Sequence, residues 1–413
     1  MTRREVVVVT GLGVISPQGH DTAAMFATLM RGQSAVVPVF PELPKPAIAA
    51  VAPFDESRWF NKLQLAGVDR VSQMAVAAAD LALKDAGLGA GAALGADAER
   101  VGVYTGCGMG GTTALDAGYR AGLSGGRVAP LTVPALMANA PAAHVAIRHG
   151  VKGPVLTYSV ACASGAVAIS EAAKALRAGE VDVAIAGGSE ALLVPGALMA
   201  WQAMQTLASF NAGQEATACK PFAADRTGFV LGEGAAFLVL ETEAHAKARG
   251  ARIHAELAGT GLSCDSTHLT KPDASGQARA LRSALAQAGL SPADVGYCNA
   301  HGTATKVGDA VEVQALQDVW GQHVDRLKVS STKALHGHLL GATGALEAVI
   351  TVLALKQQQL PPNAHCEVPD PACALNLVRG AASHGEAAPD LQSAISNSFA
   401  FGGTNSVLLF KRV

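Results

Sequence analysis

One segment constrains the fold more than any other: two short runs rich in β-branched residues enclose an apolar helical stretch. The runs are residues 155–160 and 181–186, and the stretch between them, residues 163–178, is apolar on nearly every face. A helix that is apolar all round must be buried, and a strand, a crossover helix and a second strand form a parallel βαβ unit. The sequence therefore predicts an α/β fold with a parallel sheet.

Strand and helix signals alternate in the same way through the rest of the chain. No linker rich in proline, serine or charge interrupts this pattern. We therefore expect one compact α/β unit with a pseudo-repeat, whose halves are residues 1–250 and 251–413. Further strands are predicted at 5–10, 100–105, 253–262, 295–300, 327–331, 393–399 and 405–410, and helices at 21–30, with Asp21 as N-cap, 71–86, 277–288, 309–319 and 341–357.

The composition limits the classes of function. The chain has 413 residues, 50% of them hydrophobic, and a formal net charge of -2. This apolar fraction excludes disorder, and the even charge balance excludes a nucleic-acid partner held by bulk positive charge. The four valines near the N-terminus are too short a run for a signal peptide or a membrane span, and the longest apolar stretch contains Glu347. We therefore expect a cytoplasmic protein with no membrane partner.

Seven cysteines are spread along the chain, and no two form a CxxC pair. This pattern favours neither a disulfide framework nor a zinc site, so we expect a reduced protein without a metal. Cys162 differs from the others because it lies between a predicted strand and the first turn of a predicted helix. The free N–H groups and the helix dipole at that place stabilise a thiolate. We therefore expect a lowered pKa and a nucleophilic sulfur, with a small buried hydrophobic residue as the alternative.

Two histidines follow predicted parallel strands in loops that contain glycine. His301 lies in the sequence AHGTAT, and His338 lies in KALHGHLLG. Because α/β sheets place their sites at the C-terminal ends of strands, we expect both to meet Cys162, although either alone is more often a structural loop histidine. Lys333 and Glu347 flank the second histidine. A carboxylate in an otherwise apolar helix needs a partner, and Lys333 or a histidine is the candidate.

Two glycine-rich stretches and the C-terminal turn are weaker signals. Residues 11–13 and 106–111 resemble a dinucleotide loop only superficially, because neither has the GxGxxG pattern with its helix and acidic residue. Residues 397–405 form a turn with two aromatic side chains. It is either a plain hairpin turn or a loop whose amides and Phe401 face the site.

Taken together, these motifs resemble the β-ketoacyl-acyl-carrier-protein synthases of the thiolase-like condensing-enzyme family, most closely the ketoacyl synthase II type. The resemblance spans essentially the whole chain, through VVVTGLGVISPQG, VACASG, PFAADRTGFVLGEGA, AHGTAT, STKALHGHLLGATGALE and NSFAFGGTN. It implies a duplicated five-layer α-β-α-β-α sandwich. It also implies the decarboxylative Claisen condensation of an acyl thioester with malonyl-carrier protein, which extends an acyl chain by two carbons in fatty-acid biosynthesis.

The resemblance implies a role for each matching residue. Cys162 matches the nucleophile, and the two histidines match neutral imidazoles that stabilise the enolate formed when malonyl loses carbon dioxide, so neither is needed as a base for acyl transfer. Lys333 matches a lysine that organises the site, and Glu347 matches its acidic support. No cofactor is implied beyond the phosphopantetheine of the carrier. The other matches are the oxyanion-hole amides of Cys162 and Phe401, the Phe401 side chain as a gate, the phosphopantetheine contacts Thr303, Thr305 and, more weakly, Thr270, and the acyl-pocket positions Met109 and Trp201.

The chain departs from the family pattern in ways that keep the chemistry and leave the carrier and the acyl substrate open. The basic cluster often used to dock carrier protein is reduced to Lys62 and Arg70. The other departures are Val160 for Thr, Gln205 for Arg, Ala223 and Thr227 for acids, Lys306 for Pro, and Ala400 for Gly.

Three other functions were weighed against fatty-acid synthesis. A type II polyketide, polyene or nodulation-type synthase keeps the chemistry and changes the pathway. A non-catalytic chain-length factor is less favoured, because such partners usually lack the nucleophile. A cysteine hydrolase is disfavoured, because it has no use for two strand-end histidines and a threonine-rich loop. The resemblance also implies a homodimer, or a heterodimer with a chain-length-factor homologue, in which residues 127–137 reach across to Met109.

Overall fold

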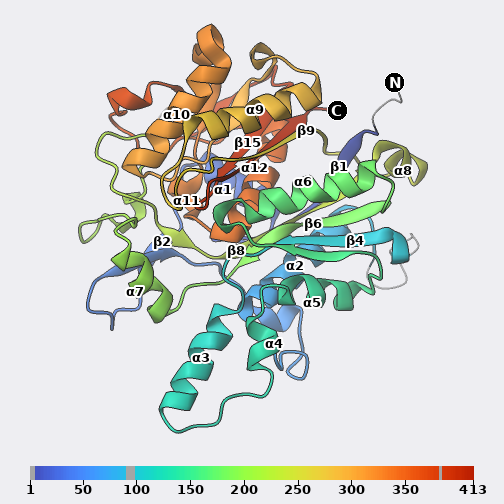
Figure 1. Cartoon of the computed structure of the whole chain (residues 1–413), viewed down its shortest axis with the longest axis vertical. Coiled ribbons are helices and arrows are strands. Elements are labelled where there is room, and N and C mark those ends of the chain that lie inside the picture. Colours follow the sequence, from blue (N-terminus) through green and yellow to red (C-terminus); the bar gives the residue numbers. More distant parts are fainter. Residues whose placement is uncertain (1–4, 90–97, 381–383) are drawn as a thin grey trace.

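The sheet that crosses the molecule in Figure 1 has eleven strands within residues 5–89, 98–380 and 384–413, which the computed structural model describes. In sheet order the strands are β13 (Asn376–Leu377), β11 (Lys328–Ser330), β10 (Tyr297–Asn299), β15 (Ser393–Phe399), β16 (Thr404–Lys411), β9 (Ala255–Cys264), β1 (Val7–Ile15), β8 (Gly234–Thr242), β6 (Val183–Glu190), β4 (Val101–Gly106) and β5 (Val155–Tyr158).

One pattern of strand pairing occurs twice in this sheet. In the first half β1 is antiparallel to β8, β8 is antiparallel to β6, and β6, β4 and β5 are parallel. In the second half β9, β16, β15, β10 and β11 repeat these relations in the same order. A short antiparallel pairing of β1 with β9 joins the halves. The chain thus has the expected pseudo-repeat, whereas its division into two domains at residue 250 stays a prediction.

Helices separate and cover the two halves of the sheet. The central layer consists of α6 (Ser164–Arg177) and α12 (Thr343–Gln357), which pack together between the two halves. The first half is covered by α2 (Arg70–Asp85) and α5 (Ala140–His149). The second half is covered by α9 (Ala274–Ala288), which is backed by α10 (Lys306–Trp320). This arrangement confirms the predicted five-layer sandwich. The other helices are α1 (Thr22–Met30), α3 (Thr112–Leu123), α4 (Thr132–Leu136), α7 (Pro195–Ala203), α8 (Glu243–Ala248) and α11 (Lys333–His336), and the minor strands are β2 (Val36–Val39), β3 (Ala47–Ala50), β7 (Leu231–Gly232), β12 (Gln359–Leu360) and β14 (Glu386–Ala387).

A long apolar helix lies in the centre of this sandwich. The segment Leu340–Gln357 is long and apolar enough to cross a membrane, but 89% of it is buried inside the fold. α12 therefore belongs to the core, as the glutamate in its sequence predicted.

β1 is longer than the sequence predicted. We expected the strand to end before Gly11, but it continues to Ile15. A Cβ atom on Gly11 would lie 2.2 Å from the carbonyl oxygen of Ala82, and one on Gly13 would lie 2.0 Å from that of Ala78. These glycines let α2 lie directly against the strand, so they serve packing rather than a dinucleotide loop.

Candidate active site

A cavity of about 380 Å³ brings the three predicted reactive side chains together. Cys162 comes from the turn between β5 and α6, His301 from the loop after β10, and His338 from the loop between α11 and α12. Their convergence follows from the parallel strands, whose C-terminal ends meet at one edge of the sheet. Other predicted site residues that line the cavity are Trp201, Thr270, Thr303, Thr305 and Phe401.

The nucleophile candidate lies on a strained turn at the start of a helix. Ala161, just before Cys162, has φ +48°, which residues other than glycine rarely adopt. The Ser164 hydroxyl holds the turn, because it accepts the N–H of Val160 at 2.9 Å and donates to the Ala161 carbonyl at 2.7 Å. Cys162 thus occupies the predicted place at the N-terminal end of α6, and it is only 7% exposed.

This burial changes the expected ionisation of the thiol. Burial raises the pKa of Cys162 to about 11, although the nearby Lys333 and the backbone amides of Phe401 and of Cys162 itself act in the opposite direction. The expectation of a lowered pKa was therefore wrong for the substrate-free protein. The sulfur carries its proton at neutral pH, and its activation requires a group that accepts that proton.

His338 is in contact with the sulfur. Its Nε2 lies 3.0 Å from Cys162 Sγ, and its Nδ1 lies 2.9 Å from the hydroxyl of Thr343. The ring of His301 packs edge-on against the ring of His338, with 5.6 Å between centroids. Nδ1 of His301 is buried and has no hydrogen-bond partner among the described residues. His338 therefore has a fixed partner on each ring nitrogen, whereas Nδ1 of His301 remains able to form a hydrogen bond.

Both histidines are neutral at physiological pH. Burial lowers their pKa values well below the ordinary 6.5, and the positive charge of Lys333 lowers them further. The sulfur and one nitrogen of each ring lie within 4.8 Å of one another, and these are also ligand types for zinc. The neighbouring ammonium group disfavours a further cation, and the expectation of no metal stays a prediction.

Lys333 and Glu347 form the predicted pair beneath the histidines. Nζ of Lys333 lies 2.6 Å from Oε1 of Glu347, and both side chains are fully buried. Burial raises the pKa of Glu347 to about 7, while the ammonium group acts to lower it. The pair joins the start of α11 to α12 and places a positive charge near both imidazoles.

A second buried carboxylate, which the sequence analysis missed, holds the His301 loop. Glu312 on α10 accepts the backbone N–H of His301 at 2.9 Å and that of Gly302 at 2.7 Å. It also accepts a hydrogen bond from the side-chain amide of Asn397 at 3.0 Å. The residue stands between two valines in the sequence. An acid among apolar neighbours is the signal that identified Glu347, and it could have identified Glu312 as well.

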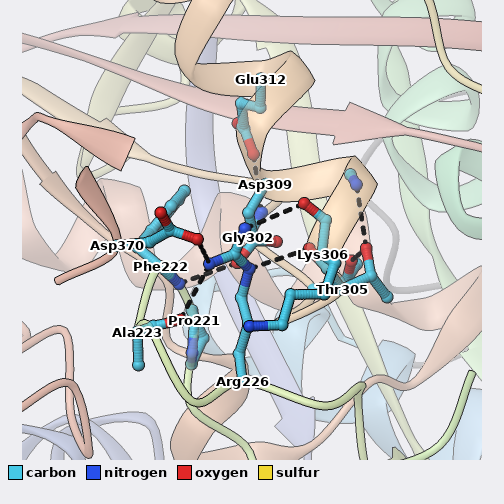
Figure 2. A network of polar contacts seen from close by, with 12 residues as sticks. Pro221, Phe222, Ala223, Arg226, Gly302, Thr305, Lys306, Asp309, Glu312 and Asp370 are labelled. Atoms are coloured by element: carbon cyan, nitrogen blue, oxygen red, sulfur yellow. Dashed lines mark hydrogen bonds and ion pairs between the residues drawn. The ribbon is translucent and has the colours of Figure 1, made fainter. Parts of the chain in front are cut away.

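An arginine network fixes the threonine-containing loop after His301 (Figure 2). The guanidinium of Arg226 is almost fully buried and donates to the carbonyls of Thr305 at 3.1 Å and Lys306 at 2.9 Å. It also pairs with Asp370 at 2.7 Å and lies 3.4 Å from a carboxylate oxygen of Asp309. The sequence motif around Arg226 therefore supports the loop rather than touching Cys162.

Comparison with known proteins identifies the family. The family model described as "Beta-ketoacyl synthase, N-terminal domain" matches residues 4–246, and "Beta-ketoacyl synthase, C-terminal domain" matches residues 254–367. The chain belongs to the β-ketoacyl synthase family. It is therefore a carbon–carbon bond-forming acyltransferase, in agreement with the resemblance noted in its motifs.

Relatives of this β-ketoacyl synthase match it along its full length. The chain is 41% identical to Nodulation protein E of Rhizobium meliloti over 417 residues, which covers 100% of both chains. It is 39% identical to 3-oxoacyl-acyl-carrier-protein synthase 2 of Staphylococcus aureus over 420 residues, covering 100% of this chain and 99% of that protein. A solved structure, the ishigamide ketosynthase/chain length factor, superposes with a TM-score of 0.90 at 33% identity and full coverage of both chains.

Aromatic rings form one wall of the synthase cavity. Trp201 stacks on Phe401 with 6.4 Å between ring centroids and meets Phe229 edge-on at 5.7 Å. Phe229 in turn contacts the ring of His338 at 5.3 Å. Met109 does not line this cavity, and its side chain is 45% exposed in the single chain. The acyl-pocket role of Trp201 and Met109 stays a prediction.

The threonines near the mouth of the cavity differ in their surroundings. The hydroxyl of Thr303 lies 3.1 Å from that of Thr305, which also caps α10 by accepting the N–H of Gly308 at 3.2 Å. Thr270 is exposed, and its N–H donates to Nδ1 of His268 at 3.1 Å. Thr303 and Thr270 are therefore available to a ligand, whereas Thr305 already has a structural role.

Proposed function

We propose that Cys162 carries the acyl group in this synthase and that the two histidines serve its transfer and extension. The supporting observation is the 3.0 Å contact of Sγ with Nε2 of His338, in a buried cavity shared with His301. The enzyme condenses that acyl group with a malonyl unit and releases carbon dioxide, so that the chain grows by two carbons. A non-catalytic chain-length factor would have no use for this contact.

In the loading step, the sulfur attacks the carbonyl carbon of an acyl thioester and the thiol of the carrier leaves. Nε2 of His338 is positioned to take the thiol proton and to return it to the departing sulfur. The backbone N–H groups of Cys162 and Phe401 lie beside the sulfur, next to the place where the oxygen of an attacked carbonyl would become negative, and they suit an oxyanion hole. The base role of His338 replaces our sequence-based view that no histidine base is needed.

In the condensation step, the malonyl unit loses carbon dioxide and the electron pair of the broken bond forms an enolate. The enolate carbon attacks the acyl carbon on Cys162, and the sulfur leaves as a thiolate that takes up one proton from solvent. Neutral His301 and His338 are suited to donate hydrogen bonds to the enolate oxygen, because a neutral imidazole N–H stabilises the negative charge without protonating it. The Thr343 hydroxyl both donates and accepts, so it tolerates either tautomer of His338.

The substrates reach the cavity on a carrier protein in this proposal. Thr303 and Thr270 would contact its phosphopantetheine arm, with Thr305 as a more constrained candidate, and no further cofactor is needed. Arg70 is held by Glu233 at 2.6 Å, so Lys62 alone remains of the sparse basic cluster. We place the enzyme in the cytoplasm, with no nucleic-acid or membrane partner.

A second candidate pathway uses the same chemistry. Full-length likeness to the ishigamide ketosynthase/chain length factor and to a structure described as a type II PKS acyl-carrier protein in complex with its ketosynthase supports a type II polyketide or polyene pathway, in which this chain would work with a chain-length-factor partner. Intact-mass detection of the acyl group loaded on Cys162 from a panel of acyl carriers decides between the two. Saturated chains of graded length support fatty-acid synthesis, and selective loading of polyunsaturated chains supports the second pathway.

We expect the synthase to be a dimer. β5 lies at the edge of the large sheet, and Val155 and Leu156 on it are exposed. α3 and α4 project from the body (Figure 1), and Leu123 is 88% exposed and Val133 63% exposed. Exposed apolar side chains on an edge strand and on two projecting helices suit a partner that covers about 2,000 Å² or more. The partner is a second copy or a chain-length-factor homologue.

Sedimentation velocity tests this expectation. Val133→Asp places a charge in the proposed interface and should convert the dimer to a folded, inactive monomer, whereas Val413→Asp at the exposed C-terminus should leave the dimer intact. A stable and active wild-type monomer would exclude an obligate dimer.

The neutral histidines make stability depend on pH. Because burial lowers the pKa of His301 and His338, their contribution is complete above the unfolded value of 6.5 and is lost as pH falls below it. Each of the two histidines should lower the free energy of unfolding by about 1.4 kcal/mol between pH 7.5 and pH 5.5. Denaturant unfolding of His301→Gln should therefore lose less stability over this interval than the wild type. The control variant His384→Gln, at an exposed position, should lose as much stability over this interval as the wild type. Equal losses of stability in all three proteins would contradict a neutral His301.

A further inference from the structure

One buried carboxylate near the site has no part in the chemistry described above. Glu190 is the last residue of β6 and is fully buried. Its Oε2 accepts the backbone N–H groups of Gly108 at 2.8 Å and Gly341 at 3.0 Å, and its Oε1 accepts that of Met109 at 3.1 Å. Within the described part of the chain, amides rather than a cation satisfy this carboxylate. Glu190 therefore ties together the ends of β4 and β6 and the turn that begins α12.

The surrounding backbone is shaped to receive this carboxylate. A Cβ atom on Gly108 would lie 2.6 Å from Oε2 of Glu190, and one on Gly341 would lie 2.8 Å from the same oxygen. Leu340, beside Gly341, has φ +41°, a conformation that is sterically unfavourable for a residue other than glycine. Such a conformation persists only when its surroundings hold it. The hydrogen bond from Gly341 to Glu190 is one of the contacts that hold this strained turn.

The strained turn positions the hydrogen-bond partner of the His338 ring. Thr343 follows Gly341 by two residues, and its hydroxyl is the 2.9 Å partner of His338 Nδ1. The opposite nitrogen of that ring faces Cys162 at 3.0 Å. A displacement of the turn would therefore move Thr343 away from the ring and release the ring from the sulfur.

We propose that Glu190 is a positioning residue, which fixes Thr343 against His338 by holding Gly341 and so keeps Nε2 of His338 on the sulfur of Cys162. This inference rests on the proposed role of His338 in loading. It gives each histidine its own carboxylate: Glu312 holds the loop of His301, and Glu190 holds the turn that orients His338. Loss of Glu190 should therefore slow loading, as loss of His338 does, whereas loss of Glu312 should act mainly on decarboxylation.

The geometry also predicts a pH dependence. Burial raises the pKa of Glu190 to about 7, while the three amides act to lower it. A protonated carboxyl presents an O–H to N–H donors, so the turn should loosen as pH falls through this value. The titratable groups that feel its charge are the thiols of Cys107 and Cys162, whose pKa values it helps to raise and which keep their protons near pH 7. Burial also raises the pKa of Glu347 to about 7, so the rise in rate belongs to Glu190 only if it is lost in Glu190→Gln, which keeps Glu347.

Acyl loading of Glu190→Gln, followed by intact mass from pH 6 to 8, tests the proposal. The variant should load about 10- to 100-fold more slowly at pH 8, since a misplacement of about 1 Å costs up to that much. We expect the rate of the wild type to rise through pH 7, and the variant should lose this rise. Glu312→Gln is the contrast, because it should slow malonyl decarboxylation more than loading. Unchanged loading by Glu190→Gln, or a retained rise through pH 7, would overturn the proposal.

Thr343→Val provides a second test that leaves Glu190 in place. It removes the hydroxyl that contacts Nδ1 and should reproduce the loading defect in a folded protein, whether or not Glu190→Gln folds. Normal loading by Thr343→Val would show that the turn does not act through this contact. If the wild type itself failed to load acyl groups on Cys162, the proposed function would fail first.

Discussion

Replacing Cys162 with alanine is expected to abolish condensation, with a loss of about 10,000-fold or more in rate. The effect is this large because the sulfur is the atom to which the acyl group is bound, and no other cysteine lines the cavity within the described residues. The measurement is product formation from an acyl thioester and malonyl-carrier protein. Cys219→Ala is the matched control, because Cys219 is equally buried but lies outside the cavity, and it should retain activity.

Cys162→Gln separates the two halves of the reaction. The side-chain carbonyl of glutamine resembles the acylated cysteine, and its oxygen could occupy the place offered by the amides of residues 162 and 401. Malonyl decarboxylation should therefore continue while condensation stops, and carbon dioxide release without a condensed product is the expected result. If Cys162→Ala still formed product, the acyl group would be carried elsewhere and the proposed function would be wrong.

The architecture could be predicted from the sequence because buried helices and strands have recognisable patterns of apolar residues. α12 is apolar on nearly every face and α6 is apolar except for a charged stripe of Glu171, Lys174 and Arg177, since both helices are enclosed between the two halves of the sheet. The β-branched runs on either side of α6 mark parallel strands, so the position of Cys162 at a strand-to-helix turn followed without a structure. The two histidine loops were identified in the same way, because each follows a predicted strand.

Features that depend on distant backbone could not be predicted. The strand was predicted to end before Gly11, because the sequence does not show that α2 lies against that glycine. Glu190 gave no signal, since the amides that it accepts belong to segments far away in the chain. The helix terminus at Cys162 was visible in the sequence, but the enclosure that raises the pKa of its thiol was not. The sign of that shift depends on which of these two effects is larger.

The histidines are expected to divide by step, and the division follows from their distances to the sulfur. His338 contacts the thiol, so His338→Ala should slow both acyl loading and malonyl decarboxylation. No hydrogen bond joins His301 to the sulfur among the described residues, so His301→Ala should slow decarboxylation by about 100- to 1,000-fold and leave loading nearly unchanged. Loading is measured by intact mass and decarboxylation by carbon dioxide release.

The raised pKa of the thiol adds a second condition to this prediction. If His338 accepts the thiol proton, loading by His338→Ala should recover as pH rises toward about 11, where the sulfur ionises without help. His301→Ala should show no such recovery of decarboxylation, because it lacks a hydrogen-bond donor rather than a base. Exposed His384→Ala, outside the cavity, is the control for loss of an imidazole. Equal loading by His338→Ala and the wild type at pH 7 would remove the base from the mechanism and leave the helix terminus to activate Cys162.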